Sequence, residues 1–207
     1  MAKVLPLTSR PSAEPAPPAL HARAMDNLAF IRNTMENAGA FTAVSGWGMV
    51  VVGVLALVAA VVASVQPTTD RWLDVWLTIA VVAVVIQLWA MLAKARESGA
   101  SLLSGPGRKF VLAVSPPIFV GAVLTVILYR AGMSNILPGV WLLLYGTAVI
   151  AGGAFSVEIV PVMGFCFMLA GVLSLCTPMV WNDWILAASF GGLHIAFGLP
   201  IGRRYGG

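Results

Sequence analysis

The chain has 207 residues, of which 59% are hydrophobic and only 10% are charged, and its mean hydropathy is +0.93. This composition excludes an ordinary soluble globular protein and leaves little of the chain for a separate catalytic domain. The formal net charge of +4 implies no nucleic-acid partner, because the basic residues follow the topological pattern of a membrane protein.

Residues 1–22 form the first segment, in which prolines interrupt a sequence rich in alanine and serine. The segment has no apolar run long enough for a signal peptide, so no cleavage before the first membrane span is expected. A disordered cytoplasmic tail is the predicted state of these residues.

Residues 23–39 have the pattern of a short amphipathic helix. Leu28, Ile31 and Met35 share one face, and polar side chains occupy most of the remaining surface. The charges within this segment nearly cancel, whereas a helix bound to a lipid surface is usually basic. The favoured interpretation is a helix that lies along the inner interface and packs on the bundle, and the alternative is a helix that docks a partner.

Six long apolar stretches follow, and each is long enough for a helix across a bilayer core, which needs about 20 residues. They do not alternate apolar and polar residues as the strands of a membrane β-barrel would. The sequence therefore predicts an all-α, polytopic helical bundle over residues 40–204. The predicted spans are 41–65, 72–93, 110–130, 137–155, 159–177 and 184–202.

Lysine and arginine residues predict the orientation of the six spans. Ten of the twelve fall in the N-terminal tail, in the joint between the second and third spans, or at the C-terminus, and only Arg71 and Arg130 fall on the opposite side. Because cytoplasmic loops are enriched in basic residues, both termini are predicted to be cytoplasmic.

Most tryptophans lie at the predicted outer ends of spans, where indole favours the interface: Trp72, Trp76, Trp141, Trp181 and Trp184. Asp74, near Arg71, is interpreted as an interface anchor.

Small residues recur four apart along several spans, which lets helix backbones approach closely. Packing within the bundle is the first interpretation of these rows, and contact between copies of the chain is the second. Two of the rows are Ala148, Gly152 and Ser156, and Ala188, Gly192 and Ala196.

The segments Gly46–Leu57 and Gly164–Leu175 share two glycines seven residues apart and a similar apolar sequence after the second glycine. A duplicated hairpin is one explanation, as in transporters with parallel repeats. Chance similarity between segments built from glycine, valine, leucine and alanine is the other.

Three polar side chains are the candidates for an intramembrane site. Glu158 lies in the short joint before the fifth span, where it is either a first-turn acid of that helix or a proton or cation ligand. His194 lies about ten residues into the sixth span, where it is either a neutral, hydrogen-bonded histidine or a proton relay or cofactor ligand. Gln87 is expected to bond across helices.

Several chemical functions have no support in the sequence. Cys166 and Cys176 lie on one predicted helix at a separation of about 15 Å, beyond disulfide reach. One histidine within the spans supplies no metal-ligand set, and the sequence has no catalytic triad, HExxH or CxxC motif. No catalytic residue, cofactor or metal is predicted.

Four segments resemble those of small bacterial inner-membrane proteins with six spans, which look like proteins encoded beside winged-helix regulators of the PadR type. These segments are the 25–37 helix, LLSGPGRKF at 102–110, GGAFS at 152–156 and FGGLHIAFG at 190–198. The last hairpin is also similar in texture to HdeD-like acid-resistance membrane proteins, in the spacing of Gly164, Gly171, Pro178, Gly191 and Gly198. The resemblance implies a membrane component of a regulated unit and assigns no substrate.

These observations predict a multi-pass protein of the bacterial inner membrane without enzymatic activity. Its expected role is structural or regulatory, through other membrane proteins or through self-association as a homo-oligomer, with the lipid bilayer as its surroundings. The alternative is a small transporter or channel for protons, ions or a small solute. A water-accessible cavity between Glu158 and His194 would favour the alternative.

Overall fold

The computed structural model describes residues 25–28, 30–31, 44–97, 105–154 and 156–205. The chain divides into two units, Met1–Ala38 and Gly39–Gly207. In the first unit the described residues are helical, and they fall inside the predicted amphipathic helix. The predicted tail, residues 1–22, lies outside the described residues.

Within its described residues, all secondary-structure elements of the second unit are helices, and this confirms the predicted all-α fold. Six of its helical segments are long and apolar enough to cross a membrane, so by length and hydropathy the chain is a multi-pass membrane protein. The first five are α2 (Gly46–Ser64), α3 (Thr69–Glu97), α4 (Gly105–Arg130), α5 (Leu137–Gly153) and α6 (Ile159–Cys176). The sixth combines α7 (Asn182–Leu186), the π-helix η3 (Ala187–Leu193) and α8 (His194–Tyr205), and the short 3-10 turns η1 (Ser134–Ile136) and η2 (Met179–Trp181) precede α5 and α7.

Local sequence sets several of the helix ends. The Ser45 hydroxyl accepts a hydrogen bond of 3.1 Å from the Gly48 N–H, which caps the start of α2. Between α4 and α5 the chain turns at Gly132, whose φ of 72° favours glycine. Pro138 stands in the first turn of α5, where its missing N–H removes no helical hydrogen bond.

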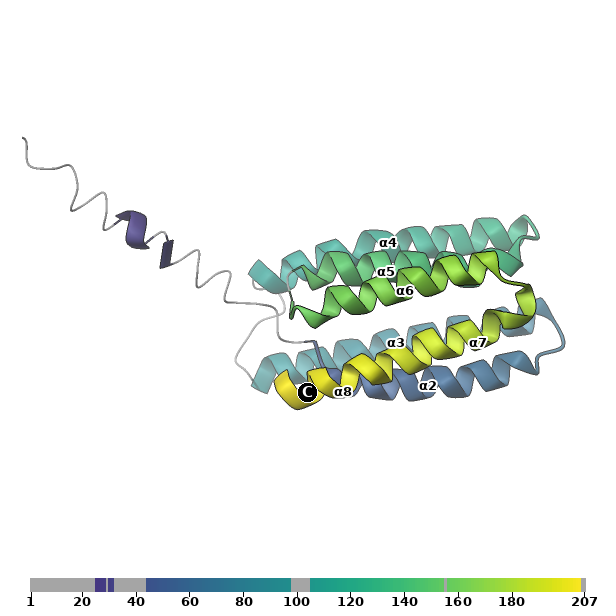
Figure 1. Ribbon diagram of the computed structural model, residues 1–207, viewed down its shortest axis with the longest axis horizontal. Helices are drawn as coiled ribbons and strands as arrows, with labels where there is room; N and C mark the ends of the chain where they lie inside the picture. The colour runs from purple at the N-terminus through teal and green to yellow at the C-terminus, as the bar shows by residue number, and fades with distance from the viewer. Residues whose placement is uncertain (1–24, 29, 32–43, 98–104, 155, 206–207) are drawn as a thin grey trace, which may run out of the picture. The chain divides into compact units, whose positions relative to one another are not determined.

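The spans pack as two groups of three (Figure 1). The middle group consists of α4, α5 and α6, in which α5 lies against both of the others. The terminal group consists of α2, α3 and the last span, in which α2 lies against both of the others. Residues of the last span also contact α5 and α6, so the two groups meet along α7, η3 and α8.

Pairs of glycines bring α5 and α6 into close contact in the middle group. A Cβ added at Gly146 would lie 2.6 Å from the Gly164 carbonyl oxygen, and one added at Gly164 would lie 2.8 Å from the Gly146 carbonyl oxygen. Seven residues earlier on α5 and seven residues later on α6, Gly139 and Gly171 approach in the same way, and a Cβ added at either one would lie 3.0 Å from the carbonyl oxygen of the other. Glycine at these positions therefore allows direct contact between the two backbones.

The terminal group contains a second crossing of this kind, between α2 and the last span. Gly46 faces Gly198, and Gly53 faces Gly191, with a Cβ at Gly53 placed 2.8 Å from the Gly191 carbonyl oxygen. The two similar segments, Gly46–Leu57 and Gly164–Leu175, thus use their glycines for the same purpose. In a duplicated hairpin, α2 would be followed by α3, and α6 by the last span. The glycines do not face these following helices, since those of α2 meet the last span and those of α6 meet α5.

Candidate functional site

His194 lies at the junction of the two groups and is almost fully buried, with 4% of its surface exposed. Its Nδ1 lies 2.9 Å from the Phe190 carbonyl oxygen, and its Nε2 lies 2.7 Å from the Tyr145 hydroxyl. Because a carbonyl oxygen only accepts, Nδ1 carries the proton and donates it. In the neutral ring Nε2 is then the acceptor, and the Tyr145 O–H donates to it. Both ring nitrogens are therefore paired within the protein.

Three aromatic rings surround His194, and with it they form what we term the central cluster: Tyr145, Phe167, Phe190 and His194. The Tyr145 ring meets Phe167 edge-on at a centroid distance of 4.7 Å, and it meets Phe190 edge-on at 5.2 Å. Phe167 has no exposed surface. The edge-to-face contacts are the geometry that aromatic pairs prefer, so the cluster is a well-packed interior.

The central cluster joins elements from both groups. Tyr145 comes from α5 and Phe167 from α6, whereas Phe190 and His194 come from the last span. The π-helix η3 ends at Leu193, directly before His194. Its wider turn changes which residues of the last span face the interior, and π-helical turns often occur at functional positions. The Tyr145–His194 hydrogen bond is therefore a direct side-chain link between the two groups.

Aromatic contacts continue from the central cluster towards the joints between α2 and α3 and between α4 and α5. Trp76 lies 6.3 Å from Phe190, and Trp72 lies 6.4 Å from Trp76. Trp72 stacks on Trp141 of α5 at 5.6 Å with an interplanar angle of 4°. This row of rings again connects the terminal group to the middle group.

Hydrogen bonds hold two of these indole rings. The Trp72 Nε1–H donates to Asp183 at 2.7 Å, and the Trp141 Nε1–H donates to the Thr125 hydroxyl at 2.8 Å. An indole N–H in a buried or interfacial position normally has such an acceptor. Asp183 of the last span therefore holds the Trp72 ring of α3 in place within the terminal group.

Among the described residues, two buried side-chain polar atoms have no hydrogen-bond partner: Trp76 Nε1 and Gln87 Oε1. Gln87 of α3 lies against α2, since a Cβ added at Gly48 would be 3.0 Å from Gln87 Oε1. Gln87 therefore lies at the α2–α3 contact and is not part of the central cluster.

Glu158 lies on the surface, directly before α6, and its side chain makes no capping hydrogen bond to that helix. His194 is level with Phe167, which follows Glu158 by nine residues along α6. At 1.5 Å per residue this corresponds to about 13 Å along the helix axis. The structure therefore does not bring Glu158 and His194 together.

The first row of small residues lies in the interior of the middle group. Ala148 is buried, and a Cβ added at Gly152 would lie 2.6 Å from a methyl group of Val114 on α4. Ser156 follows the end of α5 and is half-buried. The first two members of this row therefore lie where α5 packs against its neighbours.

The second row of small residues, Ala188, Gly192 and Ala196, does not lie at a close contact between helices, contrary to the prediction of packing within the bundle. Ala188 and Ala196 are exposed, and a Cβ added at Gly192 would meet no atom within 4 Å. The close approach is made instead by Gly191, whose added Cβ would overlap the Leu57 side chain of α2. The π-helix over these residues accounts for the difference, because an interval of four residues assumes an uninterrupted α-helix.

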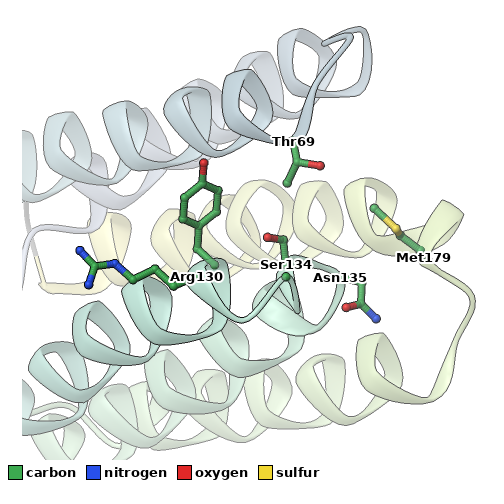
Figure 2. A pocket seen from close by; sticks show the side chains of 7 residues that line it. Thr69, Arg130, Ser134, Asn135 and Met179 are labelled. Atoms are coloured by element: carbon green, nitrogen blue, oxygen red, sulfur yellow. The ribbon is translucent and has the colours of Figure 1, made fainter.

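A shallow hollow lies where the start of α3 and the end of α4 meet the turn before α5 (Figure 2). Its volume is about 790 Å³, and it is lined by Thr69, Tyr129, Arg130, Gly132, Ser134, Asn135 and Met179. Tyr129 donates a hydrogen bond of 2.7 Å to Asp70 beside it. The Arg130 guanidinium points away from Thr69, Ser134 and Asn135, so these polar groups do not converge on one ligand position.

The sequence indicated His194 but not the aromatic residues around it. Tyr145, Phe167 and Phe190 lie in the middle of apolar spans, where single aromatic residues give no periodic signal. Trp72 and Trp141 were expected separately at the interface, and their stacking depends on how the groups meet. In the part of the chain that the structure describes, no three histidine, cysteine or acidic side chains are arranged to hold a metal ion.

Comparison with known proteins gave no match to any family model, any curated protein or any solved structure. The resemblance to small six-span bacterial proteins is therefore supported only at the level of six long apolar helices, which are those of a polytopic membrane protein.

Proposed function

We propose that the protein is a non-enzymatic component of a bacterial inner membrane, with a structural or regulatory role through other membrane proteins or through further copies of itself. The observation that carries this proposal is the pairing of both His194 ring nitrogens inside the central cluster. A histidine that relays protons at neutral pH needs a ring nitrogen that can exchange with water or with a neighbour that titrates near neutral pH. Here Tyr145 and a backbone carbonyl occupy both positions.

The proposed orientation places both termini in the cytoplasm. Lys94 and Arg96 lie in the last turn of α3, and Arg203 and Arg204 lie in the last turn of α8. The opposite ends of the spans carry Arg71 and Arg130. This distribution agrees with the enrichment of basic residues on the cytoplasmic side.

Lateral contact in the membrane has support from the second row of small residues. Ala188 and Ala196 are exposed on the last span, a Cβ at Gly192 between them would meet no atom within 4 Å, and small side chains allow another helix to approach. The rival function, a small transporter or channel, would require a wet path between Glu158 and His194. Neither the hollow of Figure 2 nor the groove between α2 and α3 is lined by either residue.

A proton-flux assay separates the two functions. The purified protein is reconstituted into liposomes loaded with a pH-sensitive dye, and wild type is compared with a variant carrying Glu158→Gln and His194→Ala. The proposal predicts that wild-type liposomes and empty liposomes acidify at the same rate. A wild-type flux that the folded double variant lacks would contradict it. Purification in mild detergent, with identification of co-purifying membrane proteins, then tests for partners.

A further inference from the structure

We propose that the groove between α2 and α3 binds a cationic amphiphile, with its ammonium group at Asp74 and its apolar part along α2. The groove has a volume of about 340 Å³, within the range of small-molecule sites. Its walls are apolar except for one hydroxyl and one carboxylate. The lining residues are Leu55, Val58, Ala59 and Val62 of α2 and Asp74, Val75, Thr78 and Ile79 of α3.

Asp74 is the only charged residue of this lining. It lies five residues into α3, or about 8 Å along the axis from Thr69, and within the apolar span Thr69–Arg96. It is exposed, and in the described part of the chain it accepts no hydrogen bond and forms no ion pair, including with Arg71. A cation that pairs with a carboxylate inside an apolar span stabilises it.

The neighbouring acid, Asp70, has a hydrogen-bond partner, unlike Asp74. Asp70 lies one turn earlier on α3 and accepts a hydrogen bond of 2.7 Å from the Tyr129 hydroxyl. Its carboxylate is thus engaged by the protein, whereas that of Asp74 is free to meet a ligand. The two acids provide a matched pair for an experiment.

The polarity of the groove fits a molecule with one charged end. The joint between α2 and α3 consists of only four residues, so the two helices run antiparallel, and Val62 near the end of α2 lies towards the same end as Asp74. Leu55 and Ile79 line the part of the groove farther from that joint. An ammonium group at Asp74 would therefore stay near the interface while an alkyl or aryl tail fills the apolar part. Charge complementarity selects this class over anionic or neutral amphiphiles.

Photo-crosslinking of the full-length protein in lipid nanodiscs tests this site. The probe is an alkyl trimethylammonium that carries a benzophenone in its tail, and an uncharged alcohol with the same tail is the control probe. We expect the cationic probe to label peptides containing residues 55–62 or 75–79. Asp74→Asn should reduce this labelling about tenfold, which corresponds to about 1.4 kcal/mol. Asp70→Asn should leave it unchanged.

A second pair of variants tests the apolar part of the groove. Thr78→Phe fills the groove without changing its charge and should also reduce labelling, whereas Val81→Phe places the same side chain at an exposed position of α3 outside the groove. Intrinsic tryptophan fluorescence verifies that each variant is folded. Equal labelling by the uncharged probe, or labelling that Asp74→Asn leaves unaltered, would overturn the proposal.

Discussion

Individual side chains in the central cluster explain how a histidine is accommodated deep inside an apolar bundle. A polar group without a partner is costly in such surroundings. The Phe190 carbonyl accepts from Nδ1, and the Tyr145 hydroxyl donates to Nε2, so neither nitrogen is left unpaired. Tyr145 is needed for its hydroxyl as well as for its ring, which packs edge-on against Phe167 and Phe190.

Replacement of Tyr145 by phenylalanine tests the hydroxyl alone. The ring contacts remain, but His194 Nε2 loses its donor, and we expect the free energy of unfolding to fall by about 1 kcal/mol. The measurement is thermal unfolding in detergent followed by tryptophan fluorescence. Tyr129→Phe is the matched control, because it removes an exposed hydrogen bond to Asp70 and should have a smaller effect. Equal unfolding midpoints for the two variants would contradict this account.

At the scale of helices, glycine positions decide which faces meet. The π-helix η3 sets the register of the last span, so that Gly191 approaches α2 and Gly192 does not. The crossings of α5 with α6 and of α2 with the last span have similar geometry and are separate contacts. Each crossing should therefore respond to a change in its own glycines.

Leucine should destabilise the protein at position 191 but not at position 192. Gly191→Leu would drive a side chain into Leu57 and the Gly53 carbonyl, and overpacking of this kind costs about 1–3 kcal/mol. A Cβ at Gly192 would meet no atom within 4 Å, so Gly192→Leu should leave the unfolding midpoint close to wild type. Both variants can be compared by expression level and thermal unfolding in detergent. Greater destabilisation by Gly192→Leu would show that the register of η3 is wrong.

Alanine at two other glycines should also shift stability in opposite directions. Gly164→Ala places a Cβ 2.6 Å from the Ile150 side chain and 2.8 Å from the Gly146 carbonyl oxygen, so it should destabilise the α5–α6 contact. Gly121→Ala on α4 meets only Leu144 Cδ1 at 3.6 Å, an ordinary contact. It should stabilise by about 0.5–1 kcal/mol, because alanine favours a helix more than glycine does. Thermal unfolding of both variants measures the difference, and the same sign for both would contradict the assigned crossing.

At the scale of the whole molecule, aromatic rings join the two groups of helices, and so does Asn182 of α7, which accepts a hydrogen bond from the Ser174 hydroxyl of α6 and donates one to the Asn135 carbonyl oxygen. The stacked pair Trp72–Trp141 and the central cluster span the contact between the terminal and middle groups. The six-span arrangement also brings the first and last spans together, since α2 packs against α8 (Figure 1). The proposed topology places both ends of the bundle on one side of the membrane.

Cysteine labelling tests which side of the membrane that is. In a background where Cys166 and Cys176 are replaced by alanine, Thr69→Cys should react with a membrane-impermeant thiol reagent in intact cells. Ser101→Cys should react only after lysis, because it lies in the basic joint predicted to be cytoplasmic. Labelling of Ser101→Cys without lysis would reverse the proposed orientation.

The sequence was sufficient to predict the six helical spans but not the side-chain contacts between them. Apolar length alone located the six spans, because a bilayer imposes a minimum helix length and requires internal backbone pairing. The interval of four between small residues identified Ala148 and Gly152, which lie in an uninterrupted helix. It failed at Gly192, because no residue type in 187–193 indicates a π-helix. The central cluster depends on contacts between Tyr145, Phe167 and Phe190 that are far apart in sequence, and no local pattern reveals such contacts.

The most direct test of the central claim, that His194 is a paired structural link between the two groups, is its tautomer. Solid-state nitrogen NMR of the histidine-labelled protein in lipid bilayers at neutral pH reports which ring nitrogen carries the proton, and His21→Ala removes the second histidine signal. The hydrogen bonds predict a neutral ring with the proton on Nδ1 and with Nε2 as acceptor. A ring protonated on Nε2, or on both nitrogens, would contradict the account.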